Sequence, residues 1–380
     1  ESPSLNHFTK GVAWSPDGTC ILSADDSNAL NLYELPSDGS TQWSPVLAPR
    51  EGETVYDYKW YPHMRSDQPV TCVFASTSRD HPIHLWDAFT GTIRATYRAY
   101  DHLDENVAAY SMAFSEDGTQ LLAGYNRCVR VFDLAHPGRP ISDRPTSASR
   151  KAKTGQRGII SALAVAPESS LYAAGSYSES IVLYDLRSGK CRLEMETCCH
   201  DTGASIIGGV TQLQFSRDGR FLFSGSRRGH TPDASHVICW DVRQTGEMLA
   251  SYPRDASTYQ RIQFDLDPTG RYLVTGDEGG KAKVYDLTSG AVVKEYPRQG
   301  DVVNGVSFHP TLPLLAISTG TRHADTADVV QDSAETGDGM DTEPTTDLHQ
   351  SIIEQNFVRA LTFDDPIHSG AFPGENSEIL

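Results

Sequence analysis

The chain has 380 residues, 38% of them hydrophobic, and a formal net charge of −18. Its apolar runs are shorter than the roughly 18 residues that indicate a membrane-spanning helix, which predicts a soluble globular protein with no membrane partner. Residues 324–380 hold thirteen acids and one base, whereas the other 323 residues hold 37 acids and 31 bases. Most of the chain is nearly balanced in charge, so the acidic total does not exclude a nucleic-acid partner. Because the first residue is Glu1, we expect the chain to be part of a longer protein.

The seven cysteines are scattered and odd in number, which predicts free thiols in a reducing compartment rather than a disulfide framework. Cys191, Cys198, Cys199 and His200 are close in sequence. Structural zinc sites, however, pair their ligands at short repeated spacings, and no C-x-x-C occurs in this chain. We therefore expect neither a metal nor another cofactor.

Internal repetition is the strongest pattern in the sequence. Runs of alternating apolar residues, typical of β-strands, end in an aromatic residue followed by an acid at six places, 45 to 56 residues apart. These pairs are Tyr33-Glu34, Trp86-Asp87, Phe132-Asp133, Tyr184-Asp185, Trp240-Asp241 and Tyr285-Asp286. Upstream, two apolar strands flank turn sequences such as SPDG at 15–18 and SEDG at 115–118, whose glycines suit tight hairpins.

In chain order the repeats cover about 11–35, 55–91, 108–134, 158–189, 209–246, 259–290 and 302–363. Seven such units resemble the WD-repeat family, and this resemblance implies an all-β fold, a seven-bladed WD-repeat β-propeller. We expect a single domain over 1–363, an acidic disordered insertion at about 323–350 in blade seven, and a flexible tail at 364–380. Either the alternating residues 356–363 or residues 6–10 are predicted to close the ring.

Signatures of common catalytic sites are absent from the sequence, which has no G-x-x-x-x-G-K-S/T, no G-x-S-x-G and no H-E-x-x-H. Trp86, Asp87, Trp240 and Asp241 are expected to be structural, with the aspartates acting as turn acceptors. The sequence thus predicts a binding protein that is not an enzyme and has no small-molecule substrate.

In WD repeats, one position seven residues before the aromatic of the third strand lies at the narrow end of the channel. Counting back in this way, or forward from the preceding strand in blades five and seven, gives Asp26, Arg79, Tyr125, Tyr177, Arg227, Glu278 and Gly320. Arginine and tyrosine therefore occupy blades two to five. Arginine contacts phosphates and tyrosine stacks on bases, which favours single-stranded nucleic acid, although the same residue types also dominate protein-binding surfaces.

Loops at the same end of the channel add further basic and aromatic residues. Residues 139–157, between blades three and four, hold six bases and one acid. This loop is alternatively a nuclear-localisation patch or a solvated linker. The additional candidates for contact with RNA or a partner are Arg127, Arg150, Lys151, Lys153, Arg157, Arg228, Tyr259 and Arg261.

The stretch WDAFTGTIRATYRAYDHLDE at 86–105 combines scaffold residues with candidate site residues. Residues 92–98 are predicted as the outermost strand of blade two, where alternation places Arg94 and Arg98 on an exposed face and Tyr97 on the packed face. Tyr100 follows in the loop toward blade three. Arg94, Arg98 and Tyr100 are therefore predicted to form one edge of the binding surface.

This stretch, with SRDHPIHLWD at 78–87, GETVYDYKWY at 52–61 and QRIQFDLDPTGRYLVTG at 260–276, resembles the telomerase Cajal body protein family. The resemblance extends over roughly 8–322, and the family's final tryptophan-containing strand is not evident after it. It implies a scaffold of the nucleus and Cajal body that recognises the Cajal body box of small Cajal-body RNAs and of telomerase RNA. The implied protein partners are H/ACA ribonucleoprotein proteins and telomerase, and the implied process is telomere maintenance.

A second hypothesis is a pure protein-interaction propeller, for example the substrate receptor of a cullin ubiquitin ligase. Trp240-Asp241-Val242-Arg243 fits the W-D-x-R pattern of such receptors, and the residues from Tyr184 to Arg187 echo it. The pattern is weakly specific, because an arginine after a blade turn often pairs with the turn aspartate.

Overall fold

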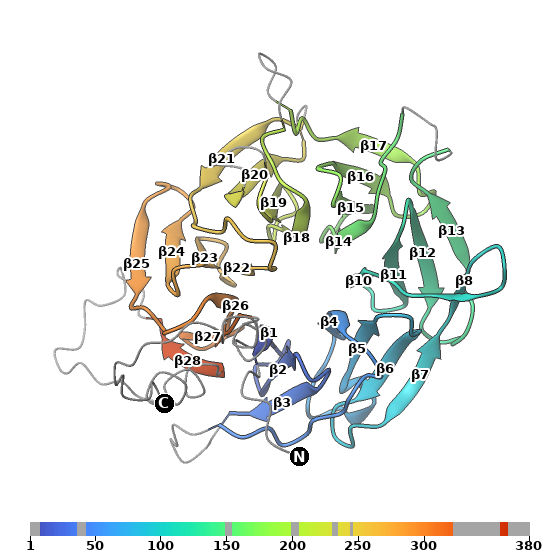
Figure 1. Cartoon of the computed structure of the whole chain (residues 1–380), viewed down its shortest axis with the longest axis horizontal. Helices are drawn as coiled ribbons and strands as arrows, with labels where there is room; N and C mark the ends of the chain where they lie inside the picture. The colour runs from blue at the N-terminus through green and yellow to red at the C-terminus, as the bar shows by residue number, and fades with distance from the viewer. Residues whose placement is uncertain are drawn as a thin grey trace, which may run out of the picture.

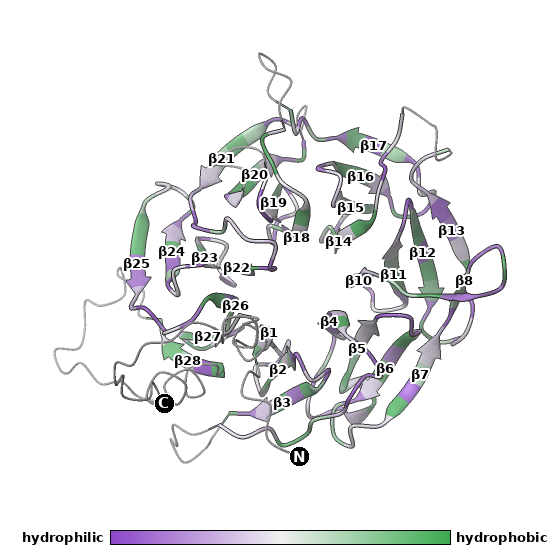
Figure 2. Cartoon of the chain, viewed as in Figure 1, coloured by the Kyte–Doolittle hydropathy of each residue, from purple (hydrophilic) through white to green (hydrophobic). Residues whose placement is uncertain are grey.

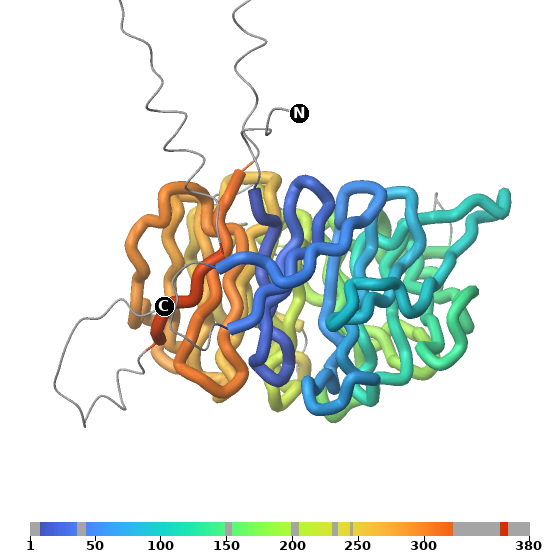
Figure 3. The backbone as a smooth tube through the Cα atoms, turned by 90° about the horizontal axis from the view of Figure 1, so that it is seen from below, coloured from blue at the N-terminus to red at the C-terminus, as the bar shows by residue number. Residues whose placement is uncertain are grey.

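The computed structural model describes residues 8–35, 43–148, 154–198, 205–229, 235–243, 246–321 and 358–363. Seven antiparallel sheets of three or four strands surround a central channel, as Figure 1 shows, so the all-β seven-bladed propeller predicted from the repeats is confirmed. Seen from the side in Figure 3, the ring is flatter than it is wide, and turns project from its two opposite faces. Within the described ranges, no helix is long and apolar enough to span a membrane.

The first three blades are built from consecutive strands, with the first strand of each blade innermost. Blade one has β1 (Thr9–Trp14), β2 (Cys20–Asp25) and β3 (Leu30–Glu34). Blade two has β4 (Val55–Trp60), β5 (Val73–Ser78), β6 (Ile83–Asp87) and β7 (Ile93–Tyr97). Blade three has β10 (Ser111–Phe114), β11 (Gln120–Tyr125), β12 (Cys128–Asp133) and β13 (Ser142–Pro145). A short 3-10 helix, η1 (Pro69–Thr71), precedes β5, and a hairpin of β8 (Ala99–Tyr100) and β9 (Asn106–Val107) joins blades two and three.

The remaining four blades repeat this order. Blade four has β14 (Ile160–Val165), β15 (Leu171–Ser176), β16 (Ile181–Asp185) and β17 (Cys191–Glu194); blade five has β18 (Val210–Phe215), β19 (Phe221–Ser226), β20 (Val237–Asp241) and β21 (Met248–Tyr252); blade six has β22 (Phe264–Leu266), β23 (Tyr272–Gly276), β24 (Ala282–Asp286) and β25 (Val292–Tyr296); blade seven has β26 (Val303–Phe308), β27 (Leu314–Thr319) and β28 (Val358–Thr362).

The turn between the first two strands is built by the same short sequence in several blades. In blade three, the Ser115 hydroxyl donates to Asp117 Oδ1 at 2.5 Å, the Thr119 amide donates to the same oxygen at 3.1 Å, and Gly118 has a φ of 66°. Glycine adopts this left-handed conformation without the steric cost that a Cβ brings. These turns lie on one face of the ring, so the turns between second and third strands lie on the other.

Apolar side chains pack mainly between neighbouring blades. One buried cluster joins blades four and five through residues such as Leu183, Ile207 and Trp240. Figure 2 shows hydrophobic residues on strands near the channel, including β14, β18 and β26. A single blade exposes both of its apolar faces, so each blade depends on its neighbours for burial.

A belt of polar contacts joins successive blades around the full circle. Each contact links a side chain or amide near an inner strand to a backbone oxygen in the adjoining blade: Trp60 to Ala13, Thr77 to Ala109, Ser111 to Ile160, Ser161 to Val210, Gln212 to Phe264, Gln263 to Asn304, and Asn304 to Thr9. These contacts fix the spacing of the inner strands, which form the wall of the channel.

The seventh blade includes a segment that lies far along the chain from its first two strands. β28 pairs antiparallel with β27, with Ala316 opposite Ala360, and it lies within the predicted 356–363 segment. Of the alternative segment 6–10, Thr9 and Lys10 begin β1 in blade one and Phe8 directly precedes them, whereas Asn6 and His7 lie outside the described ranges. The predicted acidic insertion at 323–350 and the tail at 364–380 also lie outside those ranges.

Candidate functional site

The turns between second and third strands adjoin the entrances of the inner strands. The backbone amide of Arg79 donates to Thr54 O, that of Tyr177 to Ile159 O, and that of Arg227 to Gly209 O, at 2.9 to 3.1 Å. In each case the acceptor immediately precedes an innermost strand. These turn residues therefore lie at one mouth of the channel, as the counting argument predicts.

Three of the predicted residues form a stack of alternating aromatic and cationic groups. The Arg227 guanidinium lies 4.2 Å from the centroid of the Tyr177 ring and 5.7 Å from that of the Tyr259 ring. Tyr259 is 71% exposed, whereas Arg227 and Tyr177 are partly buried. A cation on a ring face gains about 0.5–2 kcal/mol, so Arg227 orients the tyrosines it touches. The outer ring of this stack is open to a ligand.

A second aromatic pair lies at the same mouth, from the entrances of blades two and three. The rings of Tyr56 and Tyr110 stack with centroids 5.3 Å apart and planes inclined by 26°. Burial and the neighbouring Tyr110 raise the pKa of Tyr56, while the charge of Arg79 opposes the increase. Neither tyrosine was a candidate from the sequence, because neither lies at the turn position counted back from the third-strand aromatic. The signal that identifies the pair is a tyrosine at the entrance of two successive inner strands.

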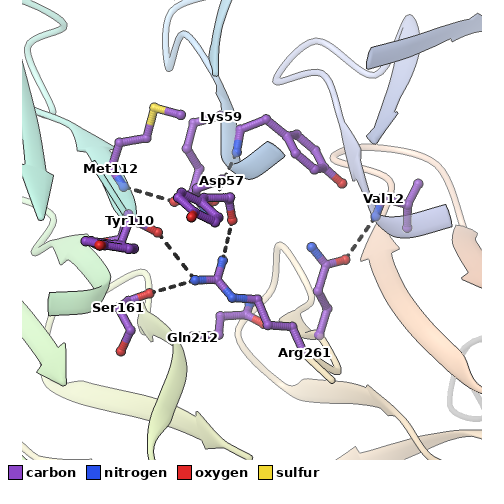
Figure 4. A network of polar contacts seen from close by, with 12 residues as sticks. Val12, Asp57, Lys59, Tyr110, Met112, Ser161, Gln212 and Arg261 are labelled. Carbon is purple, nitrogen blue, oxygen red and sulfur yellow. Dashed lines mark hydrogen bonds and ion pairs between the residues drawn. The ribbon is translucent and has the colours of Figure 1, made fainter. Parts of the chain in front are cut away.

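Arg261 links these two groups of rings across the channel. It precedes β22 in blade six, yet its Nη1 donates to Tyr56 O at 2.7 Å. Its Nη2 donates to Ser161 O at 3.1 Å, and to Tyr110 O and Tyr177 Oη at 3.4 Å each. Figure 4 shows this guanidinium among residues of three other blades. We name Tyr56, Tyr110, Tyr177, Arg227, Tyr259 and Arg261 the mouth cluster.

Tyr125 does not reach the mouth, so this expectation is corrected. Its ring is 5% exposed, packs in the core of blades two and three, and has the Arg130 guanidinium 4.9 Å from its centroid. The cause is the length of the turn, because only Asn126 and Arg127 separate β11 from β12. Counting back seven residues from Phe132 therefore reaches the last residue of β11 and not a turn residue. Arg127 lies in this turn with a φ of 56°, and its amide donates to Gly158 O.

Arg94 is exposed, as the alternation predicts, but intrachain contacts occupy its guanidinium. Nε donates to Asp87 Oδ2, Nη1 to Val70 O and Nη2 to Pro69 O, each at 2.8 Å. Arg94 lies near the start of β7, at the end of the blade opposite Arg79. These contacts fasten η1 to the outer strand, and a binding edge shared by Arg94 and Arg98 stays a prediction.

The other predicted residues occupy separate positions around the mouth cluster. Arg98 is exposed just after β7, and Tyr100 lies in β8 with the Arg139 guanidinium 4.5 Å from its ring centroid. Arg157 and Arg228 are exposed, and the Arg228 amide donates to Thr258 O beside Tyr259. Arg150, Lys151 and Lys153 lie outside the described residues.

The two tryptophan-aspartate pairs make contacts within their own blades. Trp86 Nε1 donates to Ser76 Oγ at 2.7 Å, and Trp240 Nε1 donates to Ser224 Oγ at 2.9 Å. Asp87 accepts the amide hydrogens of Phe89 and Thr90 in the following turn. Asp241 accepts bonds from the amide, Nε and Nη2 of Arg243 at 2.8 to 3.1 Å.

No group of three or more potential metal ligands is found in the part of the chain that the structure describes. Cys191 and Cys198 are exposed, while Cys199 and His200 fall outside that part. The mouth cluster supplies flat rings, cationic guanidinium groups and hydrogen-bond donors, which suit binding.

Comparison with known proteins agrees with this architecture. The family model described as WD domain, G-beta repeat matches residues 93–133 and 197–241. Telomerase Cajal body protein 1 of Mus musculus is 45% identical over 84% of this chain and 60% of its own length, and the Telomerase Cajal body protein 1 homolog of Drosophila melanogaster is 36% identical over 85% and 58%. The Guanine nucleotide-binding protein negative regulator 1 of Schizosaccharomyces pombe is 32% identical over 73% and 71%.

The repeated blades and the matched repeats define the class of protein: a WD-repeat β-propeller. Within this class, the chain belongs to the telomerase Cajal body protein family. It spans about 60% of the length of the first relatives it matches.

Proposed function

We propose that this chain is a non-enzymatic RNA-binding scaffold that recognises the Cajal body box of small Cajal-body RNAs and of telomerase RNA. The observation that carries the proposal is the Tyr177–Arg227–Tyr259 stack, whose outer ring is exposed at the channel mouth. Unpaired bases stack on such rings for about 1–3 kcal/mol each, and arginines neutralise the adjoining phosphates. Duplex RNA offers no free base face to Tyr259, so a loop is the expected ligand.

The family relationship supports the biological setting of this proposal. The mammalian and Drosophila relatives carry telomerase and the Cajal body in their names. For this chain we propose a location in the nucleus and Cajal body, with H/ACA ribonucleoprotein proteins and telomerase as partners. Its role would be to direct these particles to Cajal bodies and to support telomere maintenance. An RNA site on one face leaves the opposite face and the outer rim for proteins.

The first prediction concerns the exposed ring of the stack. Tyr259→Ala removes a stacking surface, and Tyr259→Ala combined with Arg227→Ala also removes a cation. We expect affinity for a Cajal-body-box hairpin to fall about tenfold in the single variant and further in the double variant. Fluorescence anisotropy with the hairpin, and with the same hairpin after scrambling its loop, measures the effect.

The matched control is Arg243→Ala, which removes an arginine from the opposite end of β20. It should bind the hairpin as tightly as the unchanged chain. Equal binding of the box and scrambled hairpins, or full affinity in the double variant with normal melting, would contradict the proposed function.

The ubiquitin-ligase hypothesis gains no support from Arg243. Its guanidinium makes two bonds to Asp241 and lies 5.6 Å from the Phe221 ring centroid. An adaptor would have to compete with this local pair. Nuclease-sensitive recovery of box-containing RNAs favours the RNA scaffold, whereas recovery of a ligase adaptor without RNA favours the receptor.

A further inference from the structure

Arg261 brings together acceptors that belong to blades two, three and four, although it comes from blade six. Tyr56 O is in β4, Tyr110 O adjoins β10, Ser161 O is in β14, and Tyr177 Oη comes from the turn after β15. Figure 4 shows the guanidinium extended toward this opposite wall of the channel. No other contact described for the mouth cluster connects both groups of rings through a single side chain.

The acceptors of Arg261 belong to the two groups of rings. Two acceptors are the backbone oxygens of Tyr56 and Tyr110, whose rings form the stacked pair. A third is the hydroxyl of Tyr177, whose ring is the inner ring of the stack that contains Arg227. A guanidinium is planar and its donors point in fixed directions. Simultaneous bonds to these acceptors therefore fix the separation and mutual orientation of the two groups.

These same bonds remove Arg261 from direct contact with RNA. Both terminal nitrogens already donate to protein oxygens, and the side chain is largely enclosed. A phosphate that captured the guanidinium would take the donor away from partly buried carbonyls, at a cost of up to about 1–3 kcal/mol for each. Arg79, by contrast, has a side chain that is 61% exposed and lies at the rim of the mouth.

We propose that Arg261 is a positioning residue that holds the Tyr56–Tyr110 pair and the Tyr177–Arg227–Tyr259 stack as two platforms for two unpaired bases. This inference rests on the proposed RNA-binding function and corrects the prediction that Arg261 itself contacts RNA. It also specifies the ligand: the loop presents two splayed bases, one to each platform, with its backbone passing the exposed arginines at the rim.

The test compares Arg261→Met with Arg79→Met, binding a Cajal-body-box hairpin at several salt concentrations. Loss of one phosphate contact reduces the slope of log affinity against log salt by about 0.7, because fewer counterions are released. We expect Arg261→Met to bind about tenfold more weakly with an unchanged slope, and Arg79→Met to show a reduced slope. A reduced slope in Arg261→Met, or unchanged affinity in a normally melting protein, overturns the positioning role.

Two further variants keep the test informative if Arg261→Met fails to fold. Arg261→Lys keeps the charge but lacks the planar fork, so we expect the affinity to remain reduced; full recovery would indicate a simple charge effect and overturn the inference. Tyr177→Phe keeps the ring and removes one acceptor of Arg261, with an expected loss of about twofold to tenfold. If the unchanged chain does not distinguish box from scrambled hairpins, the proposed function fails, whatever Arg261 does.

Discussion

Two buried charged side chains in this propeller, Glu51 and Arg254, are matched to specific partners. Glu51, which is 6% exposed, lies between blades one and two and accepts bonds from the hydroxyls of Ser76 and Ser78 and from His84 Nδ1. Ser76 in turn accepts the indole hydrogen of Trp86, so one carboxylate orders the interior of blade two. Arg254, which is 4% exposed, uses three nitrogens on the carbonyls of Ser235, Ile262 and Ser226.

The acid dependence of stability should report the Glu51 contacts. Burial acts to raise the pKa of Glu51, but bonds from His84 and Ser76 lower it below 4.5. A folded-state pKa below the unfolded value gives stability that is present above the ordinary pKa and lost as pH falls through the folded one. Glu51→Gln should lower the free energy of unfolding at neutral pH by about 1–3 kcal/mol and flatten its fall in acid.

Chemical denaturation from neutral pH to below the ordinary carboxyl pKa checks this prediction. The matched control is Glu53→Gln, which removes an exposed carboxylate two residues away. If the free energy of unfolding falls equally with pH in Glu51→Gln and in the unchanged chain, the ionised carboxylate of Glu51 does not contribute to stability.

At the scale of the strand, the entrance of β18 depends on two glycines. A Cβ on Gly208 would lie 2.0 Å from Arg227 O, and one on Gly209 would lie 2.9 Å from Arg227 Nε. Side chains are therefore excluded where the turn of blade five crosses the inner strand. This close approach brings the guanidinium of Arg227 over the Tyr177 ring.

Gly208→Ala should displace the turn that carries Arg227. We expect a loss of about 1–3 kcal/mol in the free energy of unfolding, because the backbone must shift, and weaker binding of the Cajal-body-box hairpin. Thermal melting and anisotropy measure the two effects. Gly279→Ala is the control, since its Cβ would meet its nearest neighbour at an ordinary 3.4 Å. Equal effects of the two substitutions would refute a special role for Gly208.

The strands were predictable because period-two alternation and aspartate-glycine turns are local properties of the chain. The mouth cluster was predictable in part: Tyr177 and Arg227 lie at repeated turn positions, and these turns are alike in most blades. Tyr125 was wrong because one turn is two residues shorter than the four-residue turns of its neighbours, a difference that a fixed count cannot register. The partners of Arg94 and Arg261 belong to other segments or blades, so spacing in sequence carries no information about them.

At the scale of the whole molecule, the ring is stable only if blade seven engages blade one. The inner strands meet through Asn304 Nδ2 to Thr9 O, and Thr9 Oγ1 donates to Thr319 O. On the opposite face, His309 of blade seven bonds to Gly18 O at 3.0 Å and lies edge-on to Trp14, with ring centroids 4.6 Å apart. Every blade packs its apolar faces against two neighbours. Opening this junction therefore exposes the apolar face of blade seven and that of blade one.

Mild acid should weaken the closure of the ring through His309. The ring nitrogen Nδ1 accepts the amide hydrogens of Thr311 and Leu312, so only the unprotonated nitrogen fits. Burial lowers the pKa of His309 below 6.5, although the Gly18 carbonyl and Asp17 oppose the shift. The unfolded chain then takes up the proton first, and stability present above the ordinary pKa is lost as pH falls toward the folded value.

His309→Asn keeps a short acceptor near Nδ1 and does not titrate, so it separates packing from protonation. At neutral pH we expect its free energy of unfolding to be about 1–3 kcal/mol below that of the unchanged chain, since a buried ring is lost. This difference in free energy of unfolding should narrow as the pH falls from neutral to moderate acid. His63→Asn, which alters an exposed histidine away from this junction, is the control and should leave the difference constant. Because the blades unfold together once the ring opens, probes in blades seven and three should report the same midpoint in each variant. If the difference in free energy of unfolding between His309→Asn and the unchanged chain does not vary with pH, His309 is not the source of the propeller's acid sensitivity.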